Sequence, residues 1–230
     1  MSRNEQVLTP MFVDDADTGL VIAGLRRYNL FTAAFFLGRH ARLIAELARV
    51  SGARAGNDAL DIGCGPGKLV RALGALVGPE GTAVGVDPSA SAVDYNRRHD
   101  HFPNHRYQQA TAQGLTLPDA SFDVVTCTFV MHHVPEQHRC AAIEEMWRVL
   151  RPGGRLLLAD ADPSDRMRSA LTRIRRLTRR GEEPVDPFAG VDIRRYAETV
   201  RAVGFDEPEF VRSRYSTGIL LAVKPANSAV

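Results

Sequence analysis

The stretch ALDIGCGPGKLV, residues 59–70, constrains the fold of this 230-residue chain more than any other segment. A short apolar run ends there, three glycines follow within five positions, and apolar residues then recur at helical spacing. Glycine loses much backbone entropy on folding, so three together indicate a tight turn or a ligand that contacts bare backbone. A strand, a glycine loop and a helix in that order are typical of an open parallel sheet, which binds ligands beyond the carboxyl ends of its strands.

The same alternation continues along the chain and predicts an α/β fold, with a parallel sheet covered by helices on both faces. The two last strands are joined by only Ser216, Thr217 and Gly218, so they must be antiparallel to each other. Residues 20 to about 50 are also predicted to be helical. The strands are expected at 57–63, 81–87, 105–111, 122–130, 154–160, 208–216 and 217–225. The other helices are expected around 69–77, where apolar residues share one face, and at 89–102, 136–151 (before an RPGG turn) and about 192–203.

The composition, with 44% hydrophobic and 24% charged residues, is that of an ordinary globular protein. Three widely spaced cysteines without a CxxC pair argue against a disulfide framework or a zinc knuckle and favour a reducing compartment. The polar N-terminus MSRNEQVLTP is not followed by a signal-peptide pattern, and charged residues interrupt the apolar segment after it. We therefore expect a cytoplasmic protein.

One segment, residues 166–180, contains seven arginines and no acidic residue. On a helical wheel the arginines occupy one arc and Met167, Ala170, Leu171, Ile174 and Leu177 the opposite one. Such a helix is either a lid whose basic face meets an anionic membrane surface or an acidic acceptor, or a solvated face over an ordinary packed stripe. No aromatic residues alternate with the arginines, so nucleic acid is not expected as a partner.

Acidic residues flank the glycine loop and bear on its ligand. Asp87 ends the second strand, twenty residues after Gly67, where an acid can accept hydrogen bonds from both ribose hydroxyls of an adenosine. The spacing GCGPG differs from the GxGxxG of dinucleotide sites, and Asp61 at the end of the first strand would repel a pyrophosphate. A carboxylate there suits an ammonium or a sulfonium, and S-adenosylmethionine carries both. An NAD-dependent oxidoreductase is the disfavoured alternative.

Four segments together resemble the successive motifs of the class I S-adenosylmethionine-dependent methyltransferases: ALDIGCGPG, VGVDPS, ATAQGLTLPDASFDVVTCTFVMHHV and MWRVLRPGGRLLLAD. The resemblance covers residues 57–162 and is greatest to the branch with the ubiquinone/menaquinone C-methyltransferases. It implies a Rossmann-like, doubly wound sheet of strand order 3-2-1-4-5-7-6 with strand 7 antiparallel. It also implies cofactor roles for ten residues, from the methionine end to the adenine end: Asp61, Gly63, Gly65, Pro66, Thr128, Asp87, Pro88, Thr111, Ala112 and Gln113.

Two histidines, His132 and His133, follow the fourth strand and are the candidate catalytic bases, because imidazole titrates near neutrality. Either of them can instead have only a packing role. A metal site that combines them with Asp160 and Asp162 is disfavoured, and we expect no metal. The N-terminal segment loosely resembles the opening of the quinone methyltransferases, and Tyr28, Phe31 and Phe35 are candidate substrate contacts or core residues.

These observations predict a helical cap over residues 1–50 and a methyltransferase domain over 51–230, with a substrate-lid insertion at about 162–191. The expected activity is methyl transfer to the carbon or oxygen of a small lipophilic or aromatic acceptor. Two alternatives stay open. One is a protein that binds S-adenosylmethionine without methyl transfer, as a cyclase or a regulatory module. The other is a phospholipid or quinone methyltransferase at a membrane surface.

Overall fold

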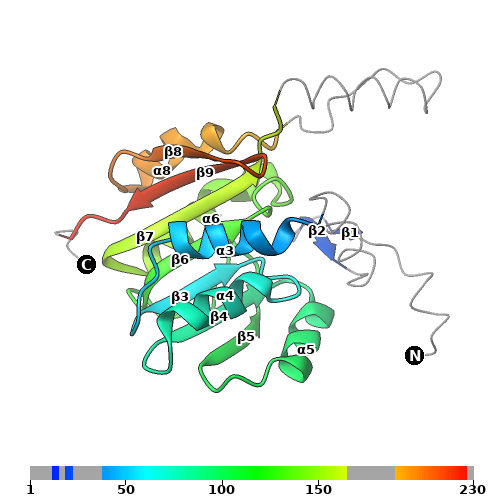
Figure 1. The fold of residues 1–230 in the computed structure, drawn as a ribbon. Coiled ribbons are helices and arrows are strands. Elements are labelled where there is room, and N and C mark those ends of the chain that lie inside the picture. The colour runs from blue at the N-terminus through cyan, green and yellow to red at the C-terminus, as the bar shows by residue number, and fades with distance from the viewer. Residues whose placement is uncertain (1–11, 16–18, 23–37, 165–189, 227–230) are drawn as a thin grey trace, which may run out of the picture.

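A seven-stranded sheet forms the centre of the protein in the computed structural model, which describes residues 12–15, 19–22, 38–164 and 190–226 (Figure 1). Its strand order is β5-β4-β3-β6-β7-β9-β8, which confirms the predicted order 3-2-1-4-5-7-6. Only β9 runs antiparallel to its two neighbours, as the short final connection requires. The strands are β3 (Asp58–Ile62), β4 (Thr82–Asp87), β5 (His105–Gln109), β6 (Phe122–Thr128), β7 (Leu150–Ala161), β8 (Glu209–Ser213) and β9 (Thr217–Val223).

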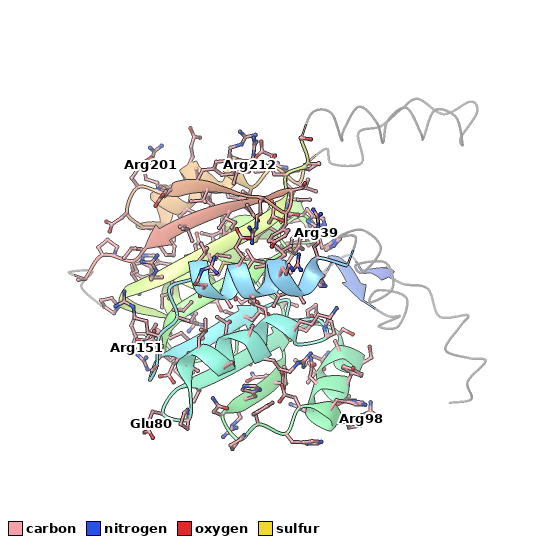
Figure 2. All side chains as sticks on the ribbon, in the orientation of Figure 1. Arg39, Glu80, Arg98, Arg151, Arg201 and Arg212 are labelled. Carbon is pink, nitrogen blue, oxygen red and sulfur yellow. The ribbon has the colours of Figure 1, made fainter. Side chains whose placement is uncertain are left out.

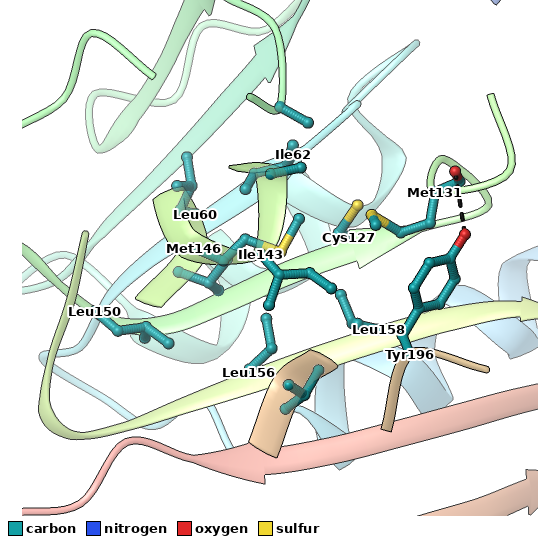
Figure 3. Packing of buried hydrophobic residues seen from close by; sticks show 14 of the residues in the cluster. Leu60, Ile62, Cys127, Met131, Ile143, Met146, Leu150, Leu156, Leu158 and Tyr196 are labelled. Atoms are coloured by element: carbon teal, nitrogen blue, oxygen red, sulfur yellow. Dashed lines mark hydrogen bonds between the residues drawn. The ribbon is translucent and has the colours of Figure 1, made fainter. Parts of the chain in front are cut away.

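Helices cover both faces of this sheet, so the central strands are buried on both sides. One face packs against α3 (His40–Val50), α4 (Lys68–Val77) and α5 (Ala90–His99), and the other against α6 (Arg139–Val149), the 3-10 turn η2 (Ile193–Tyr196) and α8 (Ala197–Val203). Figure 3 shows the second face, where Ile143 and Met146 of α6 meet Leu156 and Leu158 of β7. The alternation along β3 places Leu60 and Ile62 in this cluster and Ala59 in the other.

The predicted helical cap is wrong for residues 20–22. They belong to β2 (Gly19–Ile22), which pairs antiparallel with β1 (Phe12–Asp15) in a separate two-stranded sheet. A short apolar run such as GLVI fits a strand as well as a helix, and periodicity over four residues cannot separate them. The helix expected in this region is α3, which begins at His40.

The predicted RPGG turn also differs, because residues 151–154 lie within the bounds of β7. Helix α6 ends at Val149, and Leu150 already pairs with Phe122 of β6 before the register shifts. The N–H of Gly153 donates to the carbonyl of Lys224 at 2.8 Å, which extends the sheet along a segment that the sequence alone reads as a loop.

An ion-pair cluster joins three strands at the amino ends of the sheet. The Arg151 guanidinium lies 2.7 Å from Asp58 Oδ2 and 2.7 Å from Asp123 Oδ2, and the N–H of Asp58 donates to the same Asp123 oxygen at 2.8 Å. The two carboxylates raise the pKa of Arg151 against the opposing effect of burial. Figure 2 shows Arg151 at the end of the molecule opposite Arg39, which precedes α3.

Candidate functional site

The glycine loop after β3 turns the chain sharply toward α4. Gly63, Gly65 and Gly67 all have positive φ angles, of 72°, 47° and 71°. A Cβ on Gly63 would collide with the Val130 side chain, and one on Gly67 would lie 2.5 Å from Asn96 Oδ1. Conformation and space therefore both require glycine at these two positions.

Asp87, the last residue of β4, holds this loop from the neighbouring strand. Its Oδ2 accepts the N–H of Gly65 at 2.8 Å and its Oδ1 accepts the N–H of Ser89 at 2.9 Å. Asp87 is 3% exposed, and burial raises its pKa although the two backbone donors oppose the shift. Each carboxylate oxygen has a second lone pair, so the group retains acceptor capacity for a ligand hydroxyl.

Asp61 lies at the centre of the sheet, near the end of β3. The hydroxyl of Thr126 on β6 donates to its Oδ1 at 2.8 Å. The pKa of Asp61 is raised to about 7, chiefly by burial and also by the charge of Asp87, against the opposing effect of the Thr126 hydrogen bond. A cation placed beside Asp61 would favour its charged form and lower that pKa.

A cavity of about 40 Å³ joins the glycine loop to the end of β6. Five of the ten predicted cofactor residues line it: Asp61, Gly63, Gly65, Pro66 and Thr128. The other lining residues were not predicted: His40, Ile44, Cys64, Lys68, Leu69 and Phe129. The cavity has room for a few water molecules, so a larger ligand would extend beyond it.

The other five predicted cofactor residues lie at or after the carboxyl ends of β4 and β5. Asp87 and Gln109, the last residues of these strands, are register partners, and Gln109 Nε2 donates to the carbonyl of Pro88 at 2.9 Å. Thr111 forms an isolated bridge with Gly114, which encloses Ala112 and Gln113 in a tight turn. These residues therefore lie along the same edge of the sheet as the glycine loop.

The two candidate catalytic histidines have different environments. His132 Nδ1 lies 2.6 Å from Oδ2 of Asp160, which is buried near the end of β7, and the His132 side chain is 25% exposed. His133 packs against it, with ring centroids 3.8 Å apart. Burial, with a smaller effect from the nearby His132, lowers the pKa of His133 to about 3.

Several predictions fall outside the described residues. These are the substrate candidates Tyr28, Phe31 and Phe35, the arginine-rich segment 166–180, and most of the lid insertion at 162–191. Within the described part of the chain, no cluster of three or more histidines, cysteines and acidic residues is arranged to hold a metal ion. No helix among the described residues has the length and apolar character needed to span a bilayer.

Comparison with known proteins identifies the domain. Residues 59–154 match the family model described as a methyltransferase domain. The chain carries a class I S-adenosylmethionine-dependent methyltransferase domain. This confirms the resemblance drawn from the motifs, and with it S-adenosylmethionine as the cofactor of the family.

Curated relatives align with this methyltransferase domain at moderate identity. The chain is 38% identical over 138 residues to a "Ubiquinone/menaquinone biosynthesis C-methyltransferase UbiE" of Hahella chejuensis, which covers 58% of this chain and 55% of that protein. The Pseudomonas aeruginosa protein of the same name is 37% identical over 148 residues, with 62% and 57% covered. The match therefore spans little more than half of these relatives' length.

Solved structures share the fold of the methyltransferase domain. A SAM-dependent methyltransferase from Aquifex aeolicus matches with a TM-score of 0.63 at 19% identity and covers 79% of this chain and 89% of that one. The [4+2]-cyclase SpnF matches with a TM-score of 0.61 at 21% identity, with 81% and 82% covered. Methyl transfer and cyclisation thus both occur among proteins of this architecture.

The residues of the methyltransferase domain fit its cofactor. Asp61 offers a buried carboxyl for a positive charge, Asp87 offers acceptor lone pairs for hydroxyl groups, and Gly63 and Gly65 line the cavity without a side chain. Neither Lys68 nor His40 is among the predicted site residues, and Asp160 is predicted only as part of the disfavoured metal site. The glycine motif places Lys68 at the loop, but no local pattern connects it to His40, 28 residues away.

Proposed function

We propose that this protein transfers a methyl group from S-adenosylmethionine to an oxygen or carbon of a small acceptor that is lipophilic or aromatic and bears an acidic hydroxyl. The observation that carries the proposal is the contact of 2.6 Å between His132 and Asp160. His132 follows β6, whose last residue, Thr128, lines the cavity beside the glycine loop. A group with base character therefore lies at the same edge of the sheet as the cofactor residues.

The bound cofactor supplies an electrophilic methyl group on a sulfonium. Asp160 accepts the N–H of Ala161 at 2.8 Å through Oδ1 and faces His132 Nδ1 through Oδ2. A carboxylate accepts but does not donate, so the ring proton is on Nδ1 and Nε2 of neutral His132 is an acceptor. Nε2 would then take the hydroxyl proton of the acceptor and leave an oxyanion with its charge on oxygen or on a conjugated carbon. This oxygen or carbon would accept the methyl group and displace S-adenosylhomocysteine, and methylation on carbon would end with loss of the proton on that carbon.

His133 has a different role in this proposal. Its pKa of about 3 keeps it neutral, and its N–H donates to the carbonyl of Val130 at 2.7 Å, which closes the turn that carries His132. A base with such a low pKa binds a proton weakly near neutrality. We therefore assign the proton transfer to His132 and a packing role to His133.

The names of the curated relatives suggest an acceptor class. They describe C-methyltransferases of ubiquinone and menaquinone biosynthesis, so a phenolic or quinol-like ring is the first acceptor to test. The arginine-rich segment 166–180 extends the proposal to an anionic membrane surface, where such lipophilic molecules reside. Sedimentation with anionic vesicles at low ionic strength tests this. Binding should fade with salt and disappear when Arg173, Arg175, Arg176 and Arg179 become Gln.

The likeness to the cyclase SpnF supports one second candidate, cofactor binding without methyl transfer. Incubation with methyl-labelled S-adenosylmethionine and a panel of phenols, quinols, enols and aliphatic amines distinguishes the two. We expect label in a phenolic or enolic product and a large loss of transfer in His132→Ala at unchanged cofactor affinity. Normal cofactor binding with no label transferred to any acceptor would contradict methyl transfer and favour the second candidate.

A further inference from the structure

A lysine at the start of α4 lies in the cofactor cavity without an acidic partner. Lys68 is the first residue of α4, directly after Gly67, and it lines the cavity together with Asp61 and the glycine loop. Among the described residues, no carboxylate lies within 4.0 Å of its ammonium. Its neighbour Arg71, by contrast, donates to the carbonyl of Pro66 at 2.8 Å and lies 3.7 Å from Asp100.

The Lys68 ammonium is held in place by a histidine from another helix. Lys68 Nζ lies 3.3 Å from Nδ1 of His40, the first residue of α3. Burial, with a smaller effect from the Lys68 charge, lowers the pKa of His40 to about 4, so this ring is neutral near pH 7. An ammonium can only donate, so Nδ1 of the neutral ring accepts and orients the lysine.

The cavity is therefore lined by groups of opposite charge. The Lys68 ammonium and the amino end of α4 attract an anion, while Asp61 attracts a cation. An amino-acid zwitterion, with its carboxylate and ammonium on one carbon, matches this pair. A pyrophosphate carries only negative charge and does not match Asp61.

We infer that Lys68, oriented by His40, binds the α-carboxylate of the methionine part of the cofactor, while Asp61 faces the positively charged part. This inference rests on S-adenosylmethionine as the cofactor and adds residues that the motifs did not identify. Lys68 contacts the ligand directly, and His40 is a positioning residue. The geometry brings α3, which lies outside the glycine motif, into cofactor recognition.

Two ligands that differ at the amino-acid end test the inference by calorimetry. S-adenosylhomocysteine contains the carboxylate and the ammonium, and 5′-methylthioadenosine lacks both. We expect Lys68→Met to weaken binding of S-adenosylhomocysteine by about ten- to hundredfold, the usual effect of a lost charged hydrogen bond, and to leave 5′-methylthioadenosine within twofold. His40→Gln should give a smaller loss with the same selectivity.

Arg42→Gln is the matched control, because Arg42 is an exposed cation on α3 that does not line this cavity. It should leave the affinity for both ligands unchanged. Lys68→Gln is measured beside Lys68→Met, with circular dichroism for both, so that a folding defect in one variant does not decide the result. An equal loss for both ligands, or no loss for S-adenosylhomocysteine, would overturn the inference. Wild-type protein that binds neither ligand would overturn the cofactor assignment as well.

Discussion

The two halves of the proposed ligand-binding edge are built in different ways. Around β3 and β4, the chain's own backbone forms much of the site, through left-handed glycines and through N–H groups that donate to Asp87. After β6 and β7, side chains form it, through the contact of His132 with Asp160. A backbone site suits a ligand that is common to a whole family, whereas a side-chain site changes with single substitutions and suits the variable acceptor.

The largest effect is expected on the acceptor half, from the loss of the proposed base. His132→Ala should lower kcat by about hundredfold or more, because general base catalysis contributes 10²–10⁴-fold, while the Kd for S-adenosylmethionine stays within twofold. Turnover with the acceptor found in the labelling assay, together with calorimetry, measures both. Asp160→Asn should also lower kcat, by a smaller factor, and should likewise leave the Kd for S-adenosylmethionine within twofold. Equal losses in turnover and cofactor affinity would show that the two halves are not separate.

On the cofactor half, the loss of Asp87 should change the Kd for the cofactor. Asp87→Ala removes the acceptor of the Gly65 N–H and the acceptor proposed for the ribose hydroxyls. Each hydrogen bond to a charged group contributes about 1.5–3 kcal/mol, so the cofactor Kd should rise more than tenfold. Asp87→Asn keeps one oxygen and should have an intermediate Kd. An unchanged Kd in Asp87→Ala would show that the ribose is held elsewhere.

A medium effect is expected on stability from Asp61, the buried acid of the cofactor half. The pKa of Asp61 in the folded protein, about 7, is above the ordinary value of 3.8. Its contribution to the free energy of unfolding is therefore greatest at low pH and is lost as the pH rises through 7. Asp61→Asn should therefore raise the Tm of the cofactor-free protein at pH 8, by about 2–4 °C for each kcal/mol gained. Saturating cofactor should stabilise the wild type more than the variant. A lower Tm for the variant at pH 8 would contradict this account.

The smallest effect is expected from His133 on the acceptor half, with the opposite dependence on pH. The pKa of His133 in the folded protein, about 3, is below the ordinary value of 6.5. Its contribution to the free energy of unfolding is therefore fully present above pH 6.5 and declines as the pH falls toward 3. Urea unfolding at pH 7 and pH 5 should show a smaller decline in His133→Phe than in the wild type. The kcat of this variant at pH 7 should fall much less than that of His132→Ala. A loss as large as in His132→Ala would make His133 the base.

The same contrast explains what the sequence could predict. The strand order, the glycine loop and the placement of Asp61 and Asp87 follow from residues that are adjacent or at a set spacing, and local sequence records them. The contact of His40 with Lys68, and that of His132 with Asp160, join residues 28 positions apart from different elements. Sequence alone could name the two histidines after β6 but could not distinguish them. His133 is distinguished by its burial, and His132 by its contact with Asp160, 28 residues away.

The N-terminal error has a similar physical cause. In residues 19–22 the pattern is too short to show a period, and their pairing with residues 12–15 decides the strand. The predicted end of α6, residue 151, lies two residues beyond its actual end at Val149 for a related reason. Its continuation into β7 depends on Lys224, which meets Gly153 from a segment more than 70 residues further along the chain.

The Arg151 cluster has a consequence for laboratory evolution of this protein. It joins Asp58 and Asp123 at the amino ends of β3 and β6, while the proposed ligands bind at the carboxyl ends, about 20 Å away at the rise of a seven-residue strand. Sites so far apart with no shared partners usually contribute additively to stability. Libraries aimed at new acceptors can therefore vary the residues around His132 and leave the Arg151 cluster unchanged. Stabilising substitutions found separately near the Arg151 cluster should combine additively with those found near His132.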